Sequence, residues 1–478
     1  MNAALQAPIF IALGAAMGLA HPPFGLAPLT LFALIGVLWA LNDGLTFRRL
    51  FLLGWLFGCG HFAVAMHWIV EPFLVVPEMH GWMAPFGLVF MAGGLALFWG
   101  AAFTAYRCGG RLGLVTALCL AELARAHLMT GLPWALPSHA WIGTWGYLRA
   151  AWVGPHGLML ALGLLALLGS RSGPAAAAVA LAAVGVWTPA LPDAPQPSAD
   201  RPTIRLAQPN APQHQKWDPA HMPTFYARLL TATAAEPPVD LVVWPETAVP
   251  FWLDQGIAEI DDITMAARGA PVALGIRRFE AGEVFNSSAL LGDGGAVLAS
   301  YDKRHLVPFG EYVPFAPVLG ALGVGRFAQD TPTGFTPGAS KDLWEVEGIG
   351  GLRVLICYET IFPEEILGDE RPDALLVLTN DAWYGQFAGP FQHLALAQAR
   401  AIEFGLPVIR SANTGVSAII DPQGRILTSL ALGETGYVDG RLPEPAGETF
   451  YAKTSDWPAL ILALVLLALS PALRRFSY

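Results

Sequence analysis

Long apolar runs dominate the first 190 residues and constrain the fold of the chain more than any other feature. A run of roughly 17–25 apolar residues can cross a bilayer as a helix. A cleavable signal peptide is the alternative for the first run, but no basic region precedes it. The sequence therefore predicts an α-helical membrane bundle of about eight transmembrane helices, near residues 5–20, 26–42, 50–70, 82–105, 112–129, 152–169, 174–190 and 457–473.

Charged residues are concentrated in the rest of the chain. Residues 1–190 contain seven Lys/Arg and four Asp/Glu, whereas residues 191–456 contain eighteen and thirty-three. A transmembrane domain of seven spans (1–190) is thus predicted to lead through a Pro-rich linker (191–202) into an acidic soluble domain (203–456), followed by a last transmembrane helix and tail (457–478). The net charge of −10 belongs to the soluble domain and argues against nucleic acid as a partner.

Arginines in the loops of the apolar part indicate its orientation. Basic residues favour cytoplasmic loops. We therefore expect both termini in the cytoplasm and the acidic domain on the other, extracytoplasmic side of the membrane. Seven arginines would share the cytoplasmic side of an eight-span protein: Arg48, Arg49, Arg107, Arg111, Arg171, Arg474 and Arg475.

One pair of ionisable residues lies inside a predicted span. Glu122 and Arg125 are three residues apart, so they fall on one face of a helix. Charged residues within a membrane are candidates for function. Near a helix end they can also pair or extend toward the surface without a further role, and the sequence leaves both interpretations open.

Short apolar runs alternate with amphipathic stretches after the linker, which predicts α/β layering with some hairpins. The span 306–350 is rich in Gly, Pro and Phe and is too long for a plain connection. We interpret it as a functional loop whose apolar part, 306–324, suits a lid. Strands are predicted near 203–208, 239–244, 271–277, 285–291, 296–302, 352–357, 373–379, 407–412 and 415–420, and helices near 219–234, 256–268, 362–369 and 390–405.

Cys357 ends a predicted buried strand and is followed at once by Tyr358 and Glu359. A side chain at such a strand end is held rigidly, as nucleophiles often are. It is the only cysteine of the soluble domain, so an internal disulfide is excluded there. The alternative is an inert thiol in the core, because free cysteines are usually buried apolar residues.

Two further strands end in residues with useful chemistry. Glu246 follows the strand Asp240-Leu-Val-Val-Trp-Pro, and Lys303 follows the strand that ends in Ser300-Tyr-Asp. A carboxylate can take the proton of a thiol, and a lysine can stabilise an oxyanion. A helix-capping carboxylate and a solvated surface lysine are the alternatives.

Three segments resemble the nitrilase, or carbon–nitrogen hydrolase, superfamily. They are Trp244-Pro-Glu-Thr, Tyr301-Asp-Lys-Arg-His-Leu-Val-Pro-Phe-Gly-Glu-Tyr-Val-Pro and Ile356-Cys-Tyr-Glu. The eight-span frame and the turn Ala20-His-Pro-Pro-Phe-Gly make the membrane branch of this superfamily, the apolipoprotein N-acyltransferases, the most similar family. The resemblance implies an α-β-β-α sandwich on the outer face of the bacterial cytoplasmic membrane.

The same resemblance implies roles for individual residues. Cys357 would be the nucleophile, Glu246 the general base and Lys303 the oxyanion stabiliser. Packing is the alternative role for Trp217, and support of the triad is the alternative for two carboxylates, Glu311 and Glu359. Positions with binding or supporting roles in the family are matched by Trp217, Glu311, Tyr358, Glu359, Trp383 and Tyr384, the last two on an arm that would face lipid.

The activity implied by the resemblance is ping-pong acyl transfer. A phospholipid would acylate Cys357, and the α-amino group of the S-diacylglyceryl cysteine of a lipoprotein would then take the acyl chain from the thioester. No cofactor is implied, and no metal or nucleotide motif appears in the sequence. A membrane-anchored amidase that hydrolyses a C–N bond is one alternative. A transporter or scaffold with an inactive enzyme domain is another.

Overall fold

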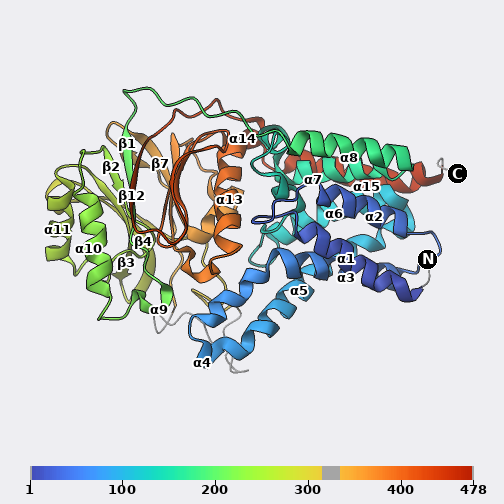
Figure 1. Ribbon diagram of the computed structural model, residues 1–478, viewed down its shortest axis with the longest axis horizontal. Helices are drawn as coiled ribbons and strands as arrows, with labels where there is room; N and C mark the ends of the chain where they lie inside the picture. The colour runs from blue at the N-terminus through green and yellow to red at the C-terminus, as the bar shows by residue number, and fades with distance from the viewer. Residues whose placement is uncertain (1–2, 315–333, 476–478) are drawn as a thin grey trace.

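The computed structural model describes residues 3–314 and 334–475, which form a helical bundle and a β-sandwich joined end to end (Figure 1). The sandwich is built from residues between 203 and 441, and the bundle from residues before 190 together with the last helix. Both ends of the described chain lie at the end of the bundle farthest from the sandwich.

Helices occupy all eight positions predicted from the apolar runs. Three segments are long and apolar enough to cross a membrane singly, Pro77–Thr104, Tyr147–Gly169 and Trp457–Arg474, and the bent pair Phe47–Ala65 with His67–Leu74 would make a fourth. Three other helices have only 12 to 16 residues, so eight spans stay a prediction. The helices are α1 (Ala3–Gly18), α2 (Leu29–Ala40), α3 (Phe47–Ala65), α5 (Ala84–Thr104), α6 (Tyr106–His127), α7 (Ala150–Gly169), α8 (Gly173–Trp187) and α15 (Trp457–Arg475).

Small residues allow the helices of the bundle to approach closely. A Cβ atom at Gly14 of α1 would lie 1.9 Å from the carbonyl oxygen of Phe57, and one at Gly60 of α3 would lie 2.2 Å from that of Ile11. Helices in lipid associate mainly through such packing, because the solvent around them is also apolar. These two glycines therefore fix the crossing of α1 and α3.

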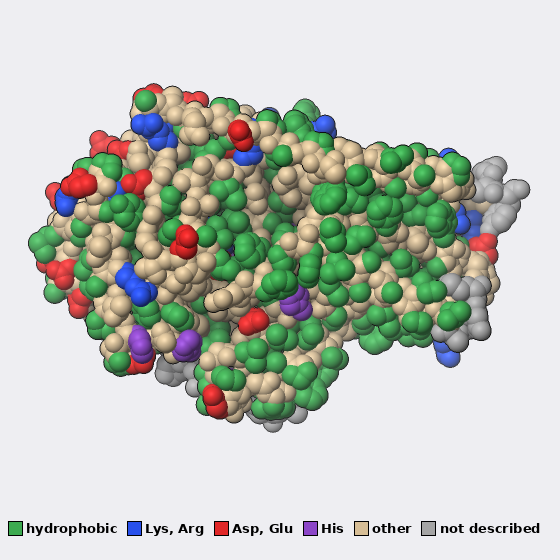
Figure 2. All heavy atoms as spheres, viewed as in Figure 1, with side chains coloured by type: hydrophobic (Ala, Val, Ile, Leu, Met, Phe, Trp, Pro, Cys, Tyr) green, Lys and Arg blue, Asp and Glu red, His purple; other side chains and the backbone are tan. Residues whose placement is uncertain are grey.

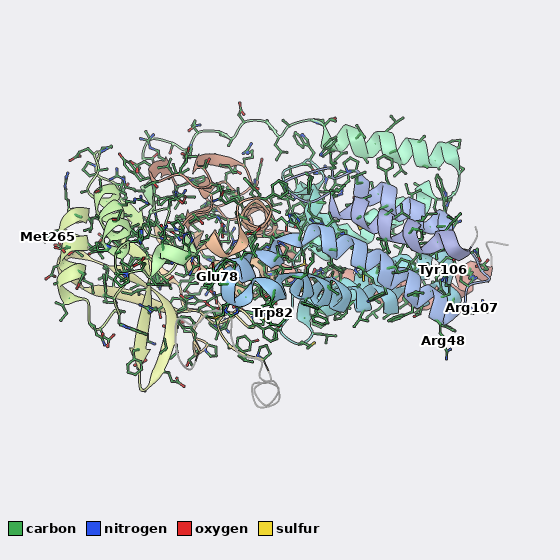
Figure 3. All side chains as sticks on the ribbon, turned by 60° about the horizontal axis from the view of Figure 1, so that its bottom comes forward. Arg48, Glu78, Trp82, Tyr106, Arg107 and Met265 are labelled. Carbon is green, nitrogen blue, oxygen red and sulfur yellow. The ribbon has the colours of Figure 1, made fainter. Side chains whose placement is uncertain are left out.

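The connection from α3 to α5 extends beside the sandwich. It consists of η1 (His67–Leu74), α4 (Pro77–His80) and η2 (Gly81–Met83). Figure 1 shows α4 at the lower edge of the molecule, at the junction of the two units, and Figure 3 places Glu78 and Trp82 there. This connection forms one wall of the cavity described below.

Two six-stranded sheets form the sandwich, with strand orders β12-β1-β2-β3-β4-β5 and β11-β10-β9-β8-β7-β6. The segments β1–β2–β3 and β7–β8–β9 are parallel, and the outer pairs are antiparallel. The strands are β1 (Thr203–Gln208), β2 (Leu241–Val243), β3 (Val272–Glu280), β4 (Glu283–Leu291), β5 (Val297–Asp302), β6 (Trp344–Val346), β7 (Gly350–Ile356), β8 (Ala374–Thr379), β9 (Val408–Ala412), β10 (Ser417–Ile420), β11 (Ile426–Leu430) and β12 (Gly436–Arg441).

Helices cover both outer faces of the sheets, which gives the predicted α-β-β-α layering. The helices α10 (Met222–Thr233) and α11 (Ile257–Ala267) pack on the first sheet, and α13 (Gly389–Phe404) packs on the second. Figure 1 shows α13 between the second sheet and the bundle. One face of α13 joins the core of the sandwich and another joins the core of the bundle, so this helix connects the two units.

The nitrilase-like α/β prediction is confirmed, with strands at all nine predicted positions. The helix predicted at 362–369 was wrong. Two 3₁₀ turns, η6 (Cys357–Ile361) and η7 (Pro363–Glu365), occur in this region, because Phe362 before Pro363 is extended. The sequence reading missed β6, β11, β12 and two short helices, α9 (Gln213–Lys216) and α14 (Phe450–Thr454).

The two units differ at the surface. On the face seen in Figure 2 the side of the bundle is largely apolar, and charged side chains gather at its far end and over the sandwich. Figure 3 places Arg48 and Arg107 at that far end, where Arg474 also bonds to the carbonyl oxygen of Arg107 at 2.6 Å. The apolar side has the surface expected of a protein embedded in lipid.

Candidate active site

Three strands deliver the predicted triad to one end of the sandwich. Glu246 follows β2, Lys303 follows β5 and Cys357 follows β7, so the two sheets contribute residues from opposite sides. All three side chains line one cavity and are at most 7% exposed. The structure thus brings together the three residues that the sequence singled out from separate segments.

Lys303 lies between two carboxylates. Its Nζ donates to Oε1 of Glu311 at 2.9 Å and lies 3.5 Å from Oε1 of Glu246. Burial alone would lower the pKa of Lys303, but the charges of Glu311 and Glu246 reverse this effect and hold the pKa above its ordinary value. Lys303 therefore stays a cation, and its two neighbours carry more negative charge than it can neutralise.

Two asparagines complete this cluster, and the sequence reading missed both roles. The side-chain amide of Asn286, on β4, donates to Glu246 and Glu311 at 2.8 Å each. The backbone N–H of Asn380 donates to Oε2 of Glu246 at 2.9 Å. The signal was the polar run Asn286-Ser-Ser inside an otherwise apolar strand, which also buries its side chains.

The backbone at Cys357 is unusual. Its φ of 49° lies in the left-handed region, which non-glycine residues adopt rarely and often at functional sites. Burial raises the pKa of the Cys357 thiol to about 12, and the negative charge of Glu246 adds to this effect more than Lys303 opposes it. The resting form is therefore a neutral thiol that needs a base.

A buried network holds the turn that carries Cys357. Nε2 of His393 lies 3.1 Å from the carbonyl oxygen of Cys357, and Nδ1 lies 2.8 Å from Oδ1 of Asp381. Arg410 donates to the other carboxylate oxygen at 2.6 Å. Burial alone would raise the pKa of Asp381, but Arg410 and His393 lower it to about 2. This network fixes the main chain of the candidate nucleophile.

Three residues of this region carry atoms that commonly bind metal ions. One ligand atom each from Cys357, Asp381 and His393 lie within 4.8 Å of one another. However, Arg410 is ion-paired with Asp381, and both ring nitrogens of His393 already contact protein oxygens. A cation beside the Arg410 guanidinium would be repelled, so the three residues fit a hydrogen-bonded scaffold better than a metal centre.

Glu359 and Tyr358 contact the segments around the Cys357 turn. The Glu359 carboxylate accepts hydrogen bonds from the Tyr301 hydroxyl (2.8 Å) and from the backbone N–H groups of Arg304, His305 and Ile356 (2.7, 3.1 and 2.7 Å). Burial raises the pKa of Glu359 to about 7, against the opposing effect of these bonds. The hydroxyl of Tyr358 reaches across to the bundle, 3.5 Å from the carbonyl oxygen of Gly131.

The predicted aromatic residues lie around the cavity. Trp217 packs against Arg277, whose guanidinium carbon is 4.5 Å from the ring centroid, and Trp383 lies in η8 (Asp381–Tyr384). Tyr384, expected on a lipid-facing arm, lines the cavity and places its hydroxyl 3.7 Å from Sγ of Cys357. Part of the predicted lid (306–324) lines the cavity at Val307 and Phe309, and its residues 315–324 lie outside the described residues.

The cavity extends from the polar cluster into the bundle. Its volume is about 850 Å³, within the range of pockets that bind small molecules or lipids. Apolar side chains from η1, η2, α5 and the loop that follows α6 form the far wall, among them Phe73, Trp82, Phe86, Phe90 and Met129. The Cys357 thiol thus lines the same cavity as these apolar side chains.

Two family models together match most of the chain. Residues 203–448 match the family described as carbon-nitrogen hydrolase, and residues 13–188 match the apolipoprotein N-acyltransferase N-terminal domain. Among solved structures, a variant of the Nesterenkonia AN1 amidase from the nitrilase superfamily is 22% identical with a TM-score of 0.39, and the match covers 54% of this chain and 96% of the amidase.

Full-length relatives give the closer comparison. A protein of Caulobacter vibrioides named apolipoprotein N-acyltransferase is 36% identical over 498 aligned positions, which cover 95% of this chain and 92% of the relative. A Brucella melitensis protein of the same name is 35% identical, and the alignment covers 97% of this chain and 94% of the relative. With a helical bundle, a nitrilase-like sandwich and relatives of this identity over both, the chain belongs to the apolipoprotein N-acyltransferase family.

Proposed function

We propose that this protein moves a fatty acyl chain from a phospholipid, through a thioester on Cys357, to the α-amino group of the S-diacylglyceryl cysteine of a lipoprotein. The observation that carries the proposal is the cavity that joins Cys357 to the apolar wall of the bundle. An apolar wall of this extent suits a fatty acyl chain, because burying the chain against it removes apolar surface from water. The names of the relatives support the acceptor.

In the first half-reaction, Glu246 accepts the proton of the Cys357 thiol while the sulfur attacks the ester carbonyl of the phospholipid. The raised pKa of the thiol makes this coupled transfer necessary, because little thiolate exists beforehand. Lys303 and the backbone N–H of Tyr358 stabilise the oxyanion, and Glu246 returns the proton to the departing glycerol oxygen. The products are an acyl thioester and a lysophospholipid.

In the second half-reaction, the α-amino group of the lipoprotein attacks the thioester. A carboxylate is again required, because an α-amino group with a pKa near 8 is only partly neutral at pH 7. Glu246 takes the amine proton and passes it to the sulfur, which restores the thiol. The product is an N-acylated lipoprotein, and this reaction is the last step of lipoprotein maturation.

The residues around the triad have supporting roles in this proposal. Glu311 and Asn286 hold Lys303 and Glu246 at their positions through 2.8–2.9 Å hydrogen bonds. Glu359 anchors the backbone on both sides of the site, and Tyr358 joins the nucleophile turn to the bundle. Trp217 and Trp383 are proposed to contact substrate, since both line the cavity.

We further propose that the bundle lies in the bacterial inner membrane with both termini in the cytoplasm and the sandwich on the periplasmic side. Arginines and both chain ends lie at the end of the bundle away from the sandwich, which supports this orientation under the positive-inside rule. The proposed units are the helices of 1–190, the linker 191–202, the catalytic domain 203–456 and the helix and tail of 457–478. Both substrates would then reach the cavity from the outer leaflet.

Intact-protein mass spectrometry of the full-length protein in detergent micelles tests the function. Incubation with dipalmitoylphosphatidylethanolamine should add one palmitoyl group, and a synthetic diacylated lipopeptide should remove it. The Cys357→Ala variant should stay unmodified. A wild-type protein that gains no acyl group but releases ammonia from a small amide would instead support the membrane-anchored amidase.

A further inference from the structure

Tyr384 lies closer to the candidate nucleophile than any role in the proposed cycle requires. Its hydroxyl oxygen is 3.7 Å from Sγ of Cys357, within hydrogen-bonding range for sulfur. The ring packs against the hydrophobic cores of both the bundle and the sandwich. Tyr384 therefore connects the membrane half of the molecule directly to the reacting atom.

The position of the ring is fixed from three sides. It makes edge contacts with Trp68, Trp134 and His393, at centroid distances of 4.9, 5.6 and 5.7 Å. The fourth side is also close, because a Cβ atom at Gly389 would lie 2.4 Å from Cβ of Tyr384. Such a cage holds the hydroxyl toward the sulfur, which is its one hydrogen-bonding neighbour within the described part of the chain.

The two tryptophans of this cage are themselves held by one side chain of α13. Both indole N–H groups donate to Oε1 of Gln392, at 3.1 Å from Trp68 and 2.7 Å from Trp134. The amide of Gln392 donates to the carbonyl oxygens of Pro22 and Ala65 at 2.9 and 2.8 Å. Gln392 thus acts through the tryptophans as a positioning residue for Tyr384, and every polar atom of its side chain is used.

We propose that Tyr384 is a catalytic residue whose hydroxyl stabilises the negative charge that forms on the Cys357 sulfur when the acyl group leaves it. The inference rests on the proposed acyl transfer and adds a group to its second half-reaction. A hydrogen bond to an ionised acceptor is roughly twice as strong as one between neutral groups. The hydroxyl therefore favours the state with charge on sulfur over both the thiol and the thioester.

The balance of the step is complete within the site. The amine nitrogen forms a bond to the acyl carbon, the C–S bond breaks and its electron pair goes to Sγ. The amine proton goes to Glu246 and then to Sγ, while Tyr384 only donates a hydrogen bond and keeps its proton. Burial and the nearby Cys357 charge raise the pKa of Tyr384 well above its ordinary value, which is consistent with a donor that does not ionise.

The two half-reactions should depend on this hydroxyl to different degrees. In acylation the last bond to break is the one between the acyl carbon and the glycerol oxygen, because an alkoxide leaves less readily than a thiolate. At that stage the sulfur is bound to the acyl carbon and carries no charge. In discharge the bond that breaks is C–S, and the departing sulfur carries the charge. Loss of the hydroxyl should therefore slow discharge more than formation of the acyl-enzyme.

The Tyr384→Phe variant of the full-length protein, in detergent micelles, tests the proposal. Dipalmitoylphosphatidylethanolamine acylates the protein, a synthetic diacylated lipopeptide discharges it, and mass spectrometry follows both rates. We expect discharge to slow about tenfold or more and formation to change less than about threefold, so that acyl-enzyme accumulates at steady state. Tyr226→Phe, which removes a hydroxyl bonded to the carbonyl oxygen of Glu259 far from the cavity, should leave both rates unchanged.

Two outcomes would overturn the proposal: discharge at the wild-type rate, or equal slowing of both half-reactions in a variant with the wild-type melting temperature. If Tyr384→Phe unfolds, the Gly389→Ala variant tests the proposal instead. The added Cβ atom displaces the ring of Tyr384, while the hydroxyl itself stays in the protein. This variant should slow discharge selectively, and unaltered rates would contradict the role. If wild type forms no acyl-enzyme, the proposed function fails instead. The rate at which iodoacetamide alkylates Cys357 at pH 8 then tests whether the Tyr384 hydroxyl stabilises charge on the sulfur. Slower alkylation of Tyr384→Phe than of wild type supports this role, and an equal rate overturns it.

Discussion

Two clusters of buried charge, one in the bundle and one in the sandwich, are balanced in different ways. In α6, Arg125 is paired with Glu122 and also donates to the carbonyl oxygens of Leu132 and Trp134, while Trp99 donates to Glu122. Here one cation faces one anion. In the sandwich a single ammonium, Lys303, faces the carboxylates of Glu246 and Glu311.

This difference distinguishes a structural ion pair from the cluster that we propose to be catalytic. A one-to-one pair whose donors all contact protein has no basic group to spare, so the Glu122–Arg125 pair fits a role in holding the 128–134 loop against the cavity. Two carboxylates around one lysine keep an anion that can accept a proton. Ionisable residues inside a predicted membrane span therefore need not be catalytic, even when they lie near a candidate site.

Removal of the shared cation should have the largest effect. We expect Lys303→Met to reduce the rate of acyl-enzyme formation by about 10³-fold or more, because the oxyanion loses a donor and two buried carboxylates lose their counter-ion. The free energy of unfolding should also fall, by about 3–5 kcal/mol. Mass spectrometry and thermal unfolding measure the two effects.

The matched control is Lys453→Met, which breaks an ion pair with Glu448 in which both side chains are about half exposed. Such a pair contributes only about 0–1 kcal/mol, so stability and rate should stay near wild type. If Lys303→Met retained a rate within tenfold of wild type, Lys303 would not be the oxyanion stabiliser.

A double-mutant cycle on the bundle pair should show a smaller effect, on stability. Arg125→Met leaves Glu122 buried without its cation and should cost about 3–5 kcal/mol. Adding Glu122→Gln should recover about 1–3 kcal/mol of this loss, since the orphaned charge is gone. Thermal unfolding of the four proteins in detergent gives the coupling energy, and strictly additive losses would contradict a structural pair.

The sequence predicted the triad more readily than its surroundings, for a physical reason. Glu246, Lys303 and Cys357 each follow an apolar strand, and the carboxyl ends of strands present side chains in a recognisable way. Asn286 lies within a strand instead, and its meaning comes only from the two carboxylates it joins across the site. Contacts of that kind depend on tertiary packing that local patterns do not contain.

The junction of the two units was the least predictable part. Gln392 contacts Trp68, which is 324 residues away in the chain, and Trp134, 258 residues away. The apolar periodicity of α13 predicted the helix itself, but not that opposite faces of it would join different cores. Likewise the apolar runs predicted eight helices, whereas their lengths depend on where each helix bends or ends.

Neutralising one carboxylate beside Lys303 should have an intermediate effect on rate and a modest one on stability. Glu311→Gln keeps an oxygen for Lys303, but it removes one negative charge and replaces the other oxygen, which accepts from the backbone N–H of Val307 at 2.7 Å, with an NH2 group. We expect acyl-enzyme formation to slow about tenfold, because Lys303 is held less firmly. A variant as inactive as Lys303→Met would show that Glu311, and not Glu246, supplies the base.

The smallest effect concerns Glu359, which forms no ion pair among the described residues. Its pKa of about 7 lies above the value of 4.5 for an exposed glutamate, so the native state holds a proton that the unfolded state has lost between these pH values. Its contribution to stability is therefore fully present below pH 4.5 and is lost as the pH rises to 7. Tyr301→Phe removes one hydrogen bond to the carboxylate, raises its pKa further and extends this loss to higher pH. Relative to wild type, the variant should become less stable by about 1 kcal/mol more at pH 9 than at pH 5. Thermal unfolding across this range measures the difference.

The control is Tyr437→Phe, at a more exposed tyrosine of β12, whose loss of stability relative to wild type should not change with pH. A loss that is equally constant with pH in Tyr301→Phe would mean that Glu359 does not titrate in this window.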